Sequence, residues 1–268
     1  MEKSQLRTYQ KISKKKLFNN LKSTGKTGLV LAAGYGSRLN GVSAVTCFKP
    51  LTPILGEPLI CRTIASLEKA NCSKIVLVLG HGYEEIKKKL ENTYKGETPI
   101  EFVYNEKYKL SNGVSVLSAK NSLSDVFVMT MADHILGDSL MEKAGKYEPP
   151  KDAAALLVDY KLDTIFDMDD ATKVLSQDGK IKSIGKKISQ FNCIDTGVFV
   201  CSSAMIDAMQ AFYDKHGDVS ISDGVQHLSN QGNMLTIDIG DGYWQDVDTP
   251  EMFSHVEQIL KNKSNTSI

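Results

Sequence analysis

Short, uninterrupted apolar runs recur along the first half of this 268-residue chain and limit the folds that are open to it. Gly28 to Ala33 (GLVLAA), Lys74 to Gly80 (KIVLVLG) and Asp125 to Met131 (DVFVMTM) each have the length and composition of a strand buried on both faces. Helical segments lie between them, one from Pro58 towards Asn71 and another from Tyr83 to about Asn92. This alternation predicts an α/β fold, a Rossmann-like doubly wound sheet that is mixed but mainly parallel, with helices on both faces.

The second half of the chain has shorter connections between its apolar segments. Strands are expected at Ala153 to Tyr160, around Thr172 to Leu175, at Ile181 to Ile184 and at Thr196 to Cys201. We expect these strands to extend the same sheet, so that residues 27–268 form a single domain. The hydrophobic content of 41% is sufficient for one core of that size.

Basic side chains are concentrated at the N-terminus. Residues 1–26 hold eight of the 32 lysines and arginines and one acid, Glu2, which leaves a net charge of −7 on the rest of the chain. We interpret residues 1–26 as a basic extension that is solvated, or alternatively as an arm that docks on an acidic partner or an anionic membrane surface. The acidic remainder gives no reason to expect nucleic acid as a partner.

The cysteines and the apolar runs both predict a cytoplasmic protein. The five cysteines are never closer than eight residues and form neither a CxxC pair nor a zinc-type spacing, so we expect reduced thiols. No apolar run approaches the roughly 20 residues that span a bilayer, and the basic N-terminus lacks the apolar stretch of a secretory signal.

A glycine-rich loop follows the first expected strand. Gly34 and Gly36 leave the backbone bare, so that its N–H groups can approach phosphate oxygens, and Arg38 and Lys49 could neutralise a triphosphate from either side. A dinucleotide fingerprint would need glycine where Leu39 stands, and the GK[ST] of a P-loop is missing. The loop therefore belongs to another class of phosphate site, unless it is a flexible turn with solvated cations.

Two acidic positions stand out further along the chain. Asp133 follows an expected central strand, at the edge where open α/β sheets bind ligands, and Asp248 lies in the loop WQDVDTPE. Carboxylates from two remote segments suit Mg²⁺, which is held mainly by water and substrate phosphates. Taken alone, Asp133 could equally be a helix cap or an ordinary loop residue.

The segment Leu31–Leu39 (LAAGYGSRL), followed by Lys49-Pro50-Leu51, resembles the signature of the sugar-phosphate nucleotidyltransferase superfamily. The order Lys-Pro-Leu resembles the order found in the inositol-1-phosphate cytidylyltransferase branch of this superfamily. The resemblance extends from about residue 28 to 260 and implies a nucleotide-diphospho-sugar transferase (GT-A-like) fold. Five further blocks stand in the family's order: Asn112-Gly113-x-Ser115, Met131-Ala132-Asp133-His134, Ile184-Gly185-Lys186, Asp195-Thr196-Gly197 and Asp246-Val247-Asp248-Thr249-Pro250-Glu251.

This resemblance implies a role for each matching residue. Mg²⁺ is assigned to Asp133 and Asp248, with Asp246 as an outer ligand or a substrate contact. The acceptor's phosphate is assigned to Lys186, or alternatively to its neighbour Lys187. The hydroxyl groups of a polyol are assigned to Asp195 and Thr196, which could otherwise be ordinary strand-edge residues. The catalytic cations are Arg38, Lys49 and Lys186. The nucleotide is expected to contact Leu31, Ala32, Ala33, Gly34, Gly36, Ser37, Arg38, Lys49, Asn112, Gly113, Ser115 and Ala132.

The implied reaction is Mg²⁺-dependent transfer of CMP from CTP to a small phosphorylated alcohol such as inositol 1-phosphate, with release of pyrophosphate. The acceptor's phosphate can attack the α-phosphorus directly, so His134 is expected to have a packing or supporting role rather than to act as a base or a metal ligand. The alternative acceptors are 2-aminoethylphosphonate, phosphocholine and a hexose 1-phosphate with another nucleotide. A non-catalytic nucleotide-binding regulatory protein is the alternative of another class, and a homodimer is left open.

Overall fold

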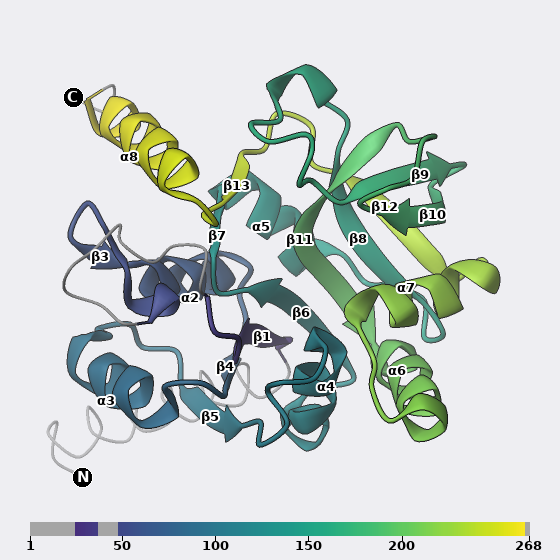
Figure 1. Cartoon of the computed structure of the whole chain (residues 1–268), viewed down its shortest axis with the longest axis horizontal. Coiled ribbons are helices and arrows are strands. Elements are labelled where there is room, and N and C mark those ends of the chain that lie inside the picture. Colours follow the sequence, from purple (N-terminus) through teal and green to yellow (C-terminus); the bar gives the residue numbers. More distant parts are fainter. Residues whose placement is uncertain (1–24, 37–47, 266–268) are drawn as a thin grey trace, which may run out of the picture.

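The computed structural model describes residues 25–36 and 48–265 (Figure 1). In this part of the chain nine strands form one sheet in the order β5-β4-β1-β6-β11-β8-β12-β10-β9. Its first four strands run parallel to one another, which confirms the doubly wound α/β fold. They are β1 (Thr27–Ala32), β4 (Lys74–Leu79), β5 (Ile100–Tyr104) and β6 (Val126–Met131).

The second half extends the same sheet with mostly antiparallel pairs. β11 (Cys193–Ser202) lies antiparallel between β6 and β8 (Ala154–Asp159), which confirms the mixed sheet expected for this half. β12 (Met234–Asp238), which was not predicted, pairs parallel with β8. The outer strands are β10 (Lys180–Gly185) and β9 (Lys173–Gln177).

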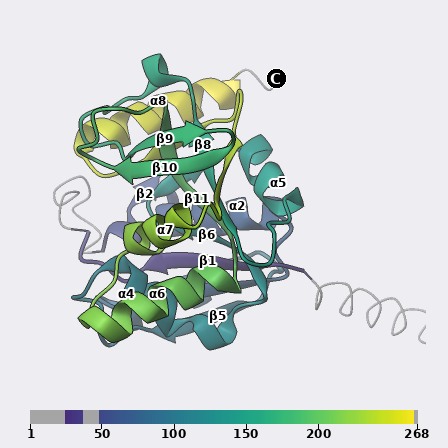
Figure 2. The same ribbon diagram turned by 90° about the vertical axis from the view of Figure 1, so that its right-hand side faces the viewer.

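Helices cover both faces of the sheet (Figures 1 and 2). Along β1, Leu29 and Leu31 pack towards one face and Val30 and Ala32 towards the other, because successive side chains of a strand alternate. The first face carries α4 (Asn112–Ser118), α6 (Ser203–His216) and α7 (Ile221–Asn230). The second carries α2 (Leu59–Lys69), α3 (Tyr83–Thr93) and α5 (Asp138–Lys146).

Several short elements lie at the carboxyl ends of the parallel strands. β7 (His134–Leu136) pairs antiparallel with β13 (Trp244–Asp246), and this pairing brings the C-terminal part of the chain against the end of β6. The helix α8 (Pro250–Asn265) follows β13 and packs through Val256 on a small apolar cluster. The remaining short elements are β2 (Pro53–Ile54), β3 (Glu57–Pro58) and the 3₁₀ turns η2 (Lys49–Leu51), η3 (Lys120–Ser122) and η4 (Leu162–Thr164).

Two predictions about the ends of segments need comment. Pro58 was expected inside the first turn of a helix, but it ends β3 and caps α2, which begins at Leu59. The proposed basic extension stays a prediction because residues 1–24 lie outside the described residues. Among the helices that the structure describes, none is long and apolar enough to cross a bilayer.

Candidate functional site

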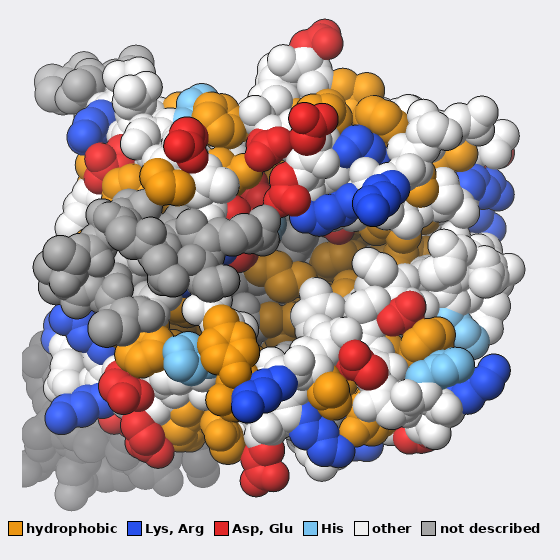
Figure 3. All heavy atoms as spheres, viewed as in Figure 1, with side chains coloured by type: hydrophobic (Ala, Val, Ile, Leu, Met, Phe, Trp, Pro, Cys, Tyr) orange, Lys and Arg blue, Asp and Glu red, His pale blue; other side chains and the backbone are white. Residues whose placement is uncertain are grey.

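A cleft of about 800 Å³ lies along the carboxyl ends of the central strands, and a hollow of about 330 Å³ adjoins it. Leu31, Gly34, Asp133 and Asp248 line both spaces, so the two are parts of one site. Figure 3 shows the molecule hollowed here, with acidic and basic side chains gathered along one edge. This is the edge at which α/β sheets bind their ligands.

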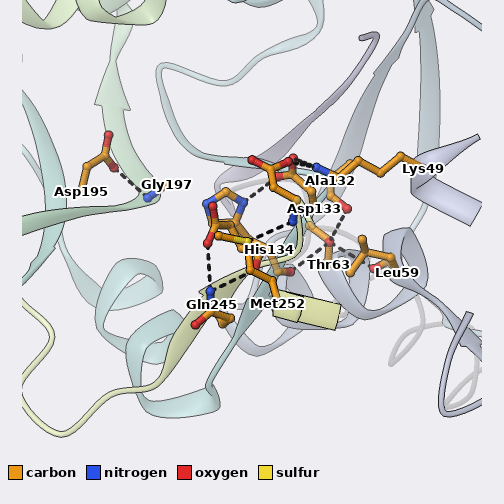
Figure 4. A network of polar contacts seen from close by, with 12 residues as sticks. Lys49, Leu59, Thr63, Ala132, Asp133, His134, Asp195, Gly197, Gln245 and Met252 are labelled. Atoms are coloured by element: carbon orange, nitrogen blue, oxygen red, sulfur yellow. Dashed lines mark hydrogen bonds and ion pairs between the residues drawn. The ribbon is translucent and has the colours of Figure 1, made fainter. Parts of the chain in front are cut away.

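At the centre of the site, the Lys49 ammonium group bridges two carboxylates (Figure 4). Its Nζ donates to Oδ2 of Asp133 over 2.6 Å and also to Oδ1 of Asp248. The Lys49 side chain is only 8% exposed, and those of Asp248 and Asp133 are 11% and 28% exposed. The structure thus brings together three predicted residues that are far apart in the sequence.

Charge compensation keeps Lys49 and Asp133 ionised. Burial by itself would lower the pKa of Lys49, but the two carboxylates outweigh burial and raise that pKa. Desolvation by itself would raise the pKa of Asp133, but Lys49 and His134 hold it well below its ordinary range. At neutral pH the site therefore contains a cation held between anions.

Short backbone connections place the two carboxylates. The β7–β13 pair sets Asp246 opposite His134. One residue further along, the backbone N–H of Val247 donates a hydrogen bond to the carbonyl of Asp133 over 2.9 Å. The carbonyl of Ala132 accepts from the Thr63 hydroxyl of α2 over 3.3 Å (Figure 4). The loops that carry Asp133 and Asp248 are therefore tied to each other and to α2.

The position of Lys49 depends on a glycine in the preceding loop. Gly36 has φ +60°, and a Cβ added there would lie 2.4 Å from Cβ of Lys49. Both the left-handed backbone and the close approach require glycine at this point. Gly36 thus holds the glycine-rich loop directly against the lysine.

His134 lies behind Asp133. Its Nδ1 is 2.7 Å from Oδ1 of Asp133, and its ring is nearly parallel to that of Trp244, with 6.3 Å between centroids. On the other side, a Cβ added to Gly197, which has φ +73°, would lie 2.4 Å from Nε2 of the histidine. The imidazole is therefore confined by neighbours on several sides and is placed to support Asp133.

Two further predicted carboxylates line the cleft near His134. Oδ1 of Asp195 accepts the N–H of Gly197 over 2.7 Å, yet burial raises the pKa of Asp195 to about 6. Burial also raises the pKa of Asp246. The pKa of His134 is raised as well, because Asp133, Asp246 and Asp195 together outweigh the effect of burial.

Sequence reasoning missed several residues of the cleft. Asp170 contacts the predicted Lys186 over 2.5 Å, and its carboxylate lies within 4.8 Å of those of Asp246 and Asp248. Asp159, at the end of β8, accepts from Nε1 of Trp244 over 2.9 Å and from Nζ of Lys161 over 2.8 Å. The acidic stretch FDMDDAT was the signal for Asp170, but a loop sequence does not indicate which of its acids faces a cleft.

The predicted nucleotide residues are partly gathered at this site. Ser37 and Arg38 lie outside the described residues. Gly113 packs instead against the loop before α7, since a Cβ there would lie 2.6 Å from the carbonyl of Val219. The predicted residues that line the cleft or the hollow are Leu31, Ala32, Ala33, Gly34, Gly36, Lys49, Asn112, Ser115 and Ala132.

One predicted substrate contact is wrong. The Thr196 side chain is fully buried, and its hydroxyl donates to the carbonyl of Leu157 over 2.8 Å. Alternation along β11 explains this, because Asp195 faces the cleft and its neighbour must then face the interior. Thr196 therefore stabilises the β11–β8 pair instead of contacting a polyol.

Oxygen donors for a divalent cation are present. Asp133 and Asp248 hold one cation, the ammonium of Lys49, and Asp170, Asp246 and Asp248 form a second set of neighbouring carboxylates. Both sets include Asp248 and consist of hard ligands with access to solvent, which fits Mg²⁺. The residues present therefore fit a magnesium ion.

Comparison with known proteins places this geometry among nucleotide-transferring enzymes. The family model described as "Nucleotidyl transferase" matches residues 27–263. The chain is 28% identical over 243 residues to the bifunctional IPC transferase and DIPP synthase of Aquifex aeolicus, covering 91% of this chain and 53% of that protein. It is 31% identical over 224 residues to the protein of the same name from Archaeoglobus fulgidus, covering 83% of this chain and 41% of that protein. The chain thus spans about half the length of these relatives.

A solved structure is similar over nearly its whole length. The inositol-1-phosphate CTP transferase from T. maritima is 28% identical and superposes with a TM-score of 0.78, covering 88% of this chain and 95% of that one. The sequence similarity and the fold therefore agree.

Proposed function

The chain belongs to the nucleotidyl transferase family, and from this premise we propose that it transfers CMP from CTP to a small phosphorylated polyol of the inositol 1-phosphate kind. The products are a CDP-alcohol and pyrophosphate. The names of the relatives and of the similar structure support this substrate pair. The observation that carries the proposal is the buried arrangement of Lys49, Asp133 and Asp248 beside the bare backbone of Gly34 and Gly36.

The nucleotide end of the cleft would bind the triphosphate. The loop at Gly34 offers backbone N–H groups at the end of β1, and Lys49 supplies a positive charge beside it. Magnesium, held by Asp133 and Asp248, would neutralise part of the phosphate charge. His134 would keep the Asp133 carboxylate oriented through its 2.7 Å contact.

The opposite end would bind the acceptor. Lys186 lines the cleft there and can pair with a phosphate dianion, and the carboxylates of Asp195 and Asp246 can accept hydrogen bonds from hydroxyl groups. Since the acceptor's phosphate is the nucleophile, the enzyme mainly has to align two polyanions and offset their charge. The same carboxylates would attract an ammonium group, so cationic acceptors belong in any test.

The testing experiment measures pyrophosphate release by the purified protein with MgCl₂ and CTP. The acceptors are inositol 1-phosphate, 2-aminoethylphosphonate, phosphocholine and glucose 1-phosphate, and Asp133→Asn is the matched inactive control. We expect release with inositol 1-phosphate that is lost in the variant. Pyrophosphate release with only one of the other acceptors would identify that acceptor as the substrate instead. No pyrophosphate release with CTP, ATP, GTP or UTP, together with nucleotide binding, would favour a regulatory protein.

The cysteines agree with the proposed cytoplasmic setting. Cys61, Cys72, Cys193 and Cys201 are buried free thiols. Buried thiols of this kind are typical of proteins from reducing compartments.

A further inference from the structure

We infer that Lys49 is a tethered stand-in for the divalent cation: its ammonium group holds Asp133 and Asp248 together in the nucleotide-free site and competes with the metal for them. The inference rests on the proposed magnesium-dependent transfer, because it concerns the same two carboxylates. According to this inference, the protein without nucleotide binds the metal weakly, and Lys49 is the cause of the low affinity.

The geometry gives Lys49 the place of a cation. One nitrogen contacts an oxygen from each of two carboxylates that come from separate segments, 84 and 199 residues away from it in the sequence. A metal held by both Asp133 and Asp248 would compete with the ammonium group for their oxygens, and the two cations would repel each other at this distance. Metal binding is therefore weakened while Lys49 stays in this position.

The charges explain why some cation must be present. Two ionised carboxylates held close together repel each other, and the crowding is increased by Asp170 and Asp246, whose oxygens lie within 4.8 Å of Asp248. Removing the cation from such a buried cluster leaves its anions uncompensated, which is strongly destabilising. Lys49 provides this compensation with a side chain that is only 8% exposed.

The surroundings of Lys49 also provide a place to which the ammonium group can move. Gly36 lies against Cβ, Cγ and Cδ of Lys49, and Lys49 lines the hollow of about 330 Å³ together with Gly34 and Gly36. A polyphosphate in that hollow would offer the ammonium group new anionic partners. The Lys49 ammonium group could then turn from the carboxylates to the phosphates, which would release Asp133 and Asp248 to the metal.

The test measures Mn²⁺ binding to the full chain without nucleotide, from the loss of the electron paramagnetic resonance signal of free Mn²⁺. The variants are Lys49→Gln, which removes the competing charge, and Lys49→Arg, which keeps it. We expect Lys49→Gln to bind Mn²⁺ more tightly than wild type by about 5–150-fold, the usual range of coupling between two sites. Lys49→Arg should bind as weakly as wild type, and Lys49→Gln with Asp133→Asn should lose the tight binding.

Thermal melting provides a second readout, and its wild-type measurement does not depend on a folded variant. If Lys49 excludes the metal, MgCl₂ should leave the wild-type Tm nearly unchanged, whereas it should raise the Tm of Lys49→Gln. Equal Mn²⁺ affinity in wild type and Lys49→Gln, or a wild-type Tm that rises with MgCl₂ and loses this response in Asp133→Asn, would overturn the inference. No CTP or acceptor is used, so failure here leaves pyrophosphate release untouched, and failure of pyrophosphate release leaves this result intact.

Discussion

The substitution Gly197→Ala should damage the site through His134, although Gly197 lies on β11, two residues after Asp195, and the histidine lies on β7. A Cβ at this position would lie 2.4 Å from Nε2 of His134, whereas real Cβ contacts are never shorter than about 3.0 Å. An exposed imidazole could turn away at little cost. This one is held by Asp133 over 2.7 Å at Nδ1 and stacks against Trp244, so a shift of the ring must weaken those contacts.

The size of the effect follows from two separate contributions. Alanine in the left-handed region at φ +73° costs about 1–2 kcal/mol. Loss of a hydrogen bond to the charged Asp133 adds about 1.5–3 kcal/mol. For turnover, displacement of a metal-site carboxylate by about 1 Å can lower the rate by about 10²-fold. We therefore expect both lower stability and much lower kcat.

Gly217 provides the matched control. It ends α6 with φ +75°, and a Cβ added there would meet no described atom within 4 Å. Gly217→Ala should thus show the backbone strain alone, with a moderate loss of stability in urea unfolding and unchanged pyrophosphate release. Comparable kcat values for Gly197→Ala and Gly217→Ala would refute the reasoning that His134 positions Asp133.

Three further predictions concern single side chains of the cleft. Lys49→Ala should lower kcat for pyrophosphate release by about 10²-fold or more while the far-ultraviolet circular dichroism stays that of wild type; near-normal turnover would be contrary to its proposed role. Lys186→Met should raise KM for the acceptor and leave KM for CTP close to wild type. A change in KM for CTP alone would indicate that Lys186 binds the nucleotide instead of the acceptor. Since the pKa of Asp195 is raised to about 6, native protein binds an extra proton there between about pH 4 and 6, and wild type loses stability as the pH rises through this window. At 1.36 kcal/mol per pH unit, this loss of stability is at most about 3 kcal/mol. Urea unfolding at pH 4.5 and 7.5 should therefore show a smaller difference in the free energy of unfolding for Asp195→Asn than for wild type. An equal difference in the two proteins would contradict the raised pKa.

The sequence predicted the long buried strands because burial on both faces produces a continuous apolar run. β4 (Lys74–Leu79) and β6 (Val126–Met131) therefore lie within a residue of their expected limits. The pair formed by β7 and β13 could not be found in this way. Each has three residues, too few for a period, and their pairing depends on a contact between segments about 110 residues apart.

The site was predictable where a residue type and its place in a motif together limit its role. Asp133 and Asp248 were assigned to one cation site from the resemblance, and the structure brings them to the same lysine. Thr196 was misassigned because motif matching ignored the alternation of side chains along a strand. Asp170 could not be selected, since the partner that distinguishes it from neighbouring acids, Lys186, lies 16 residues further on, after the β9–β10 hairpin.

The two ends of the cleft share one electrostatic arrangement. Lys49 is bound to Asp133 at the nucleotide end, and Lys186 is bound to Asp170 at the acceptor end. In the proposed reaction, both lysines serve phosphates, so each substrate must replace a carboxylate as the partner of a lysine. The released carboxylates are then available to a divalent cation, and all of them belong to the group around Asp248. Binding of the two substrates would thus free carboxylates at both ends of the cleft for the metal. Metal affinity would then depend on the presence of both phosphates, and the sheet would not need to rearrange.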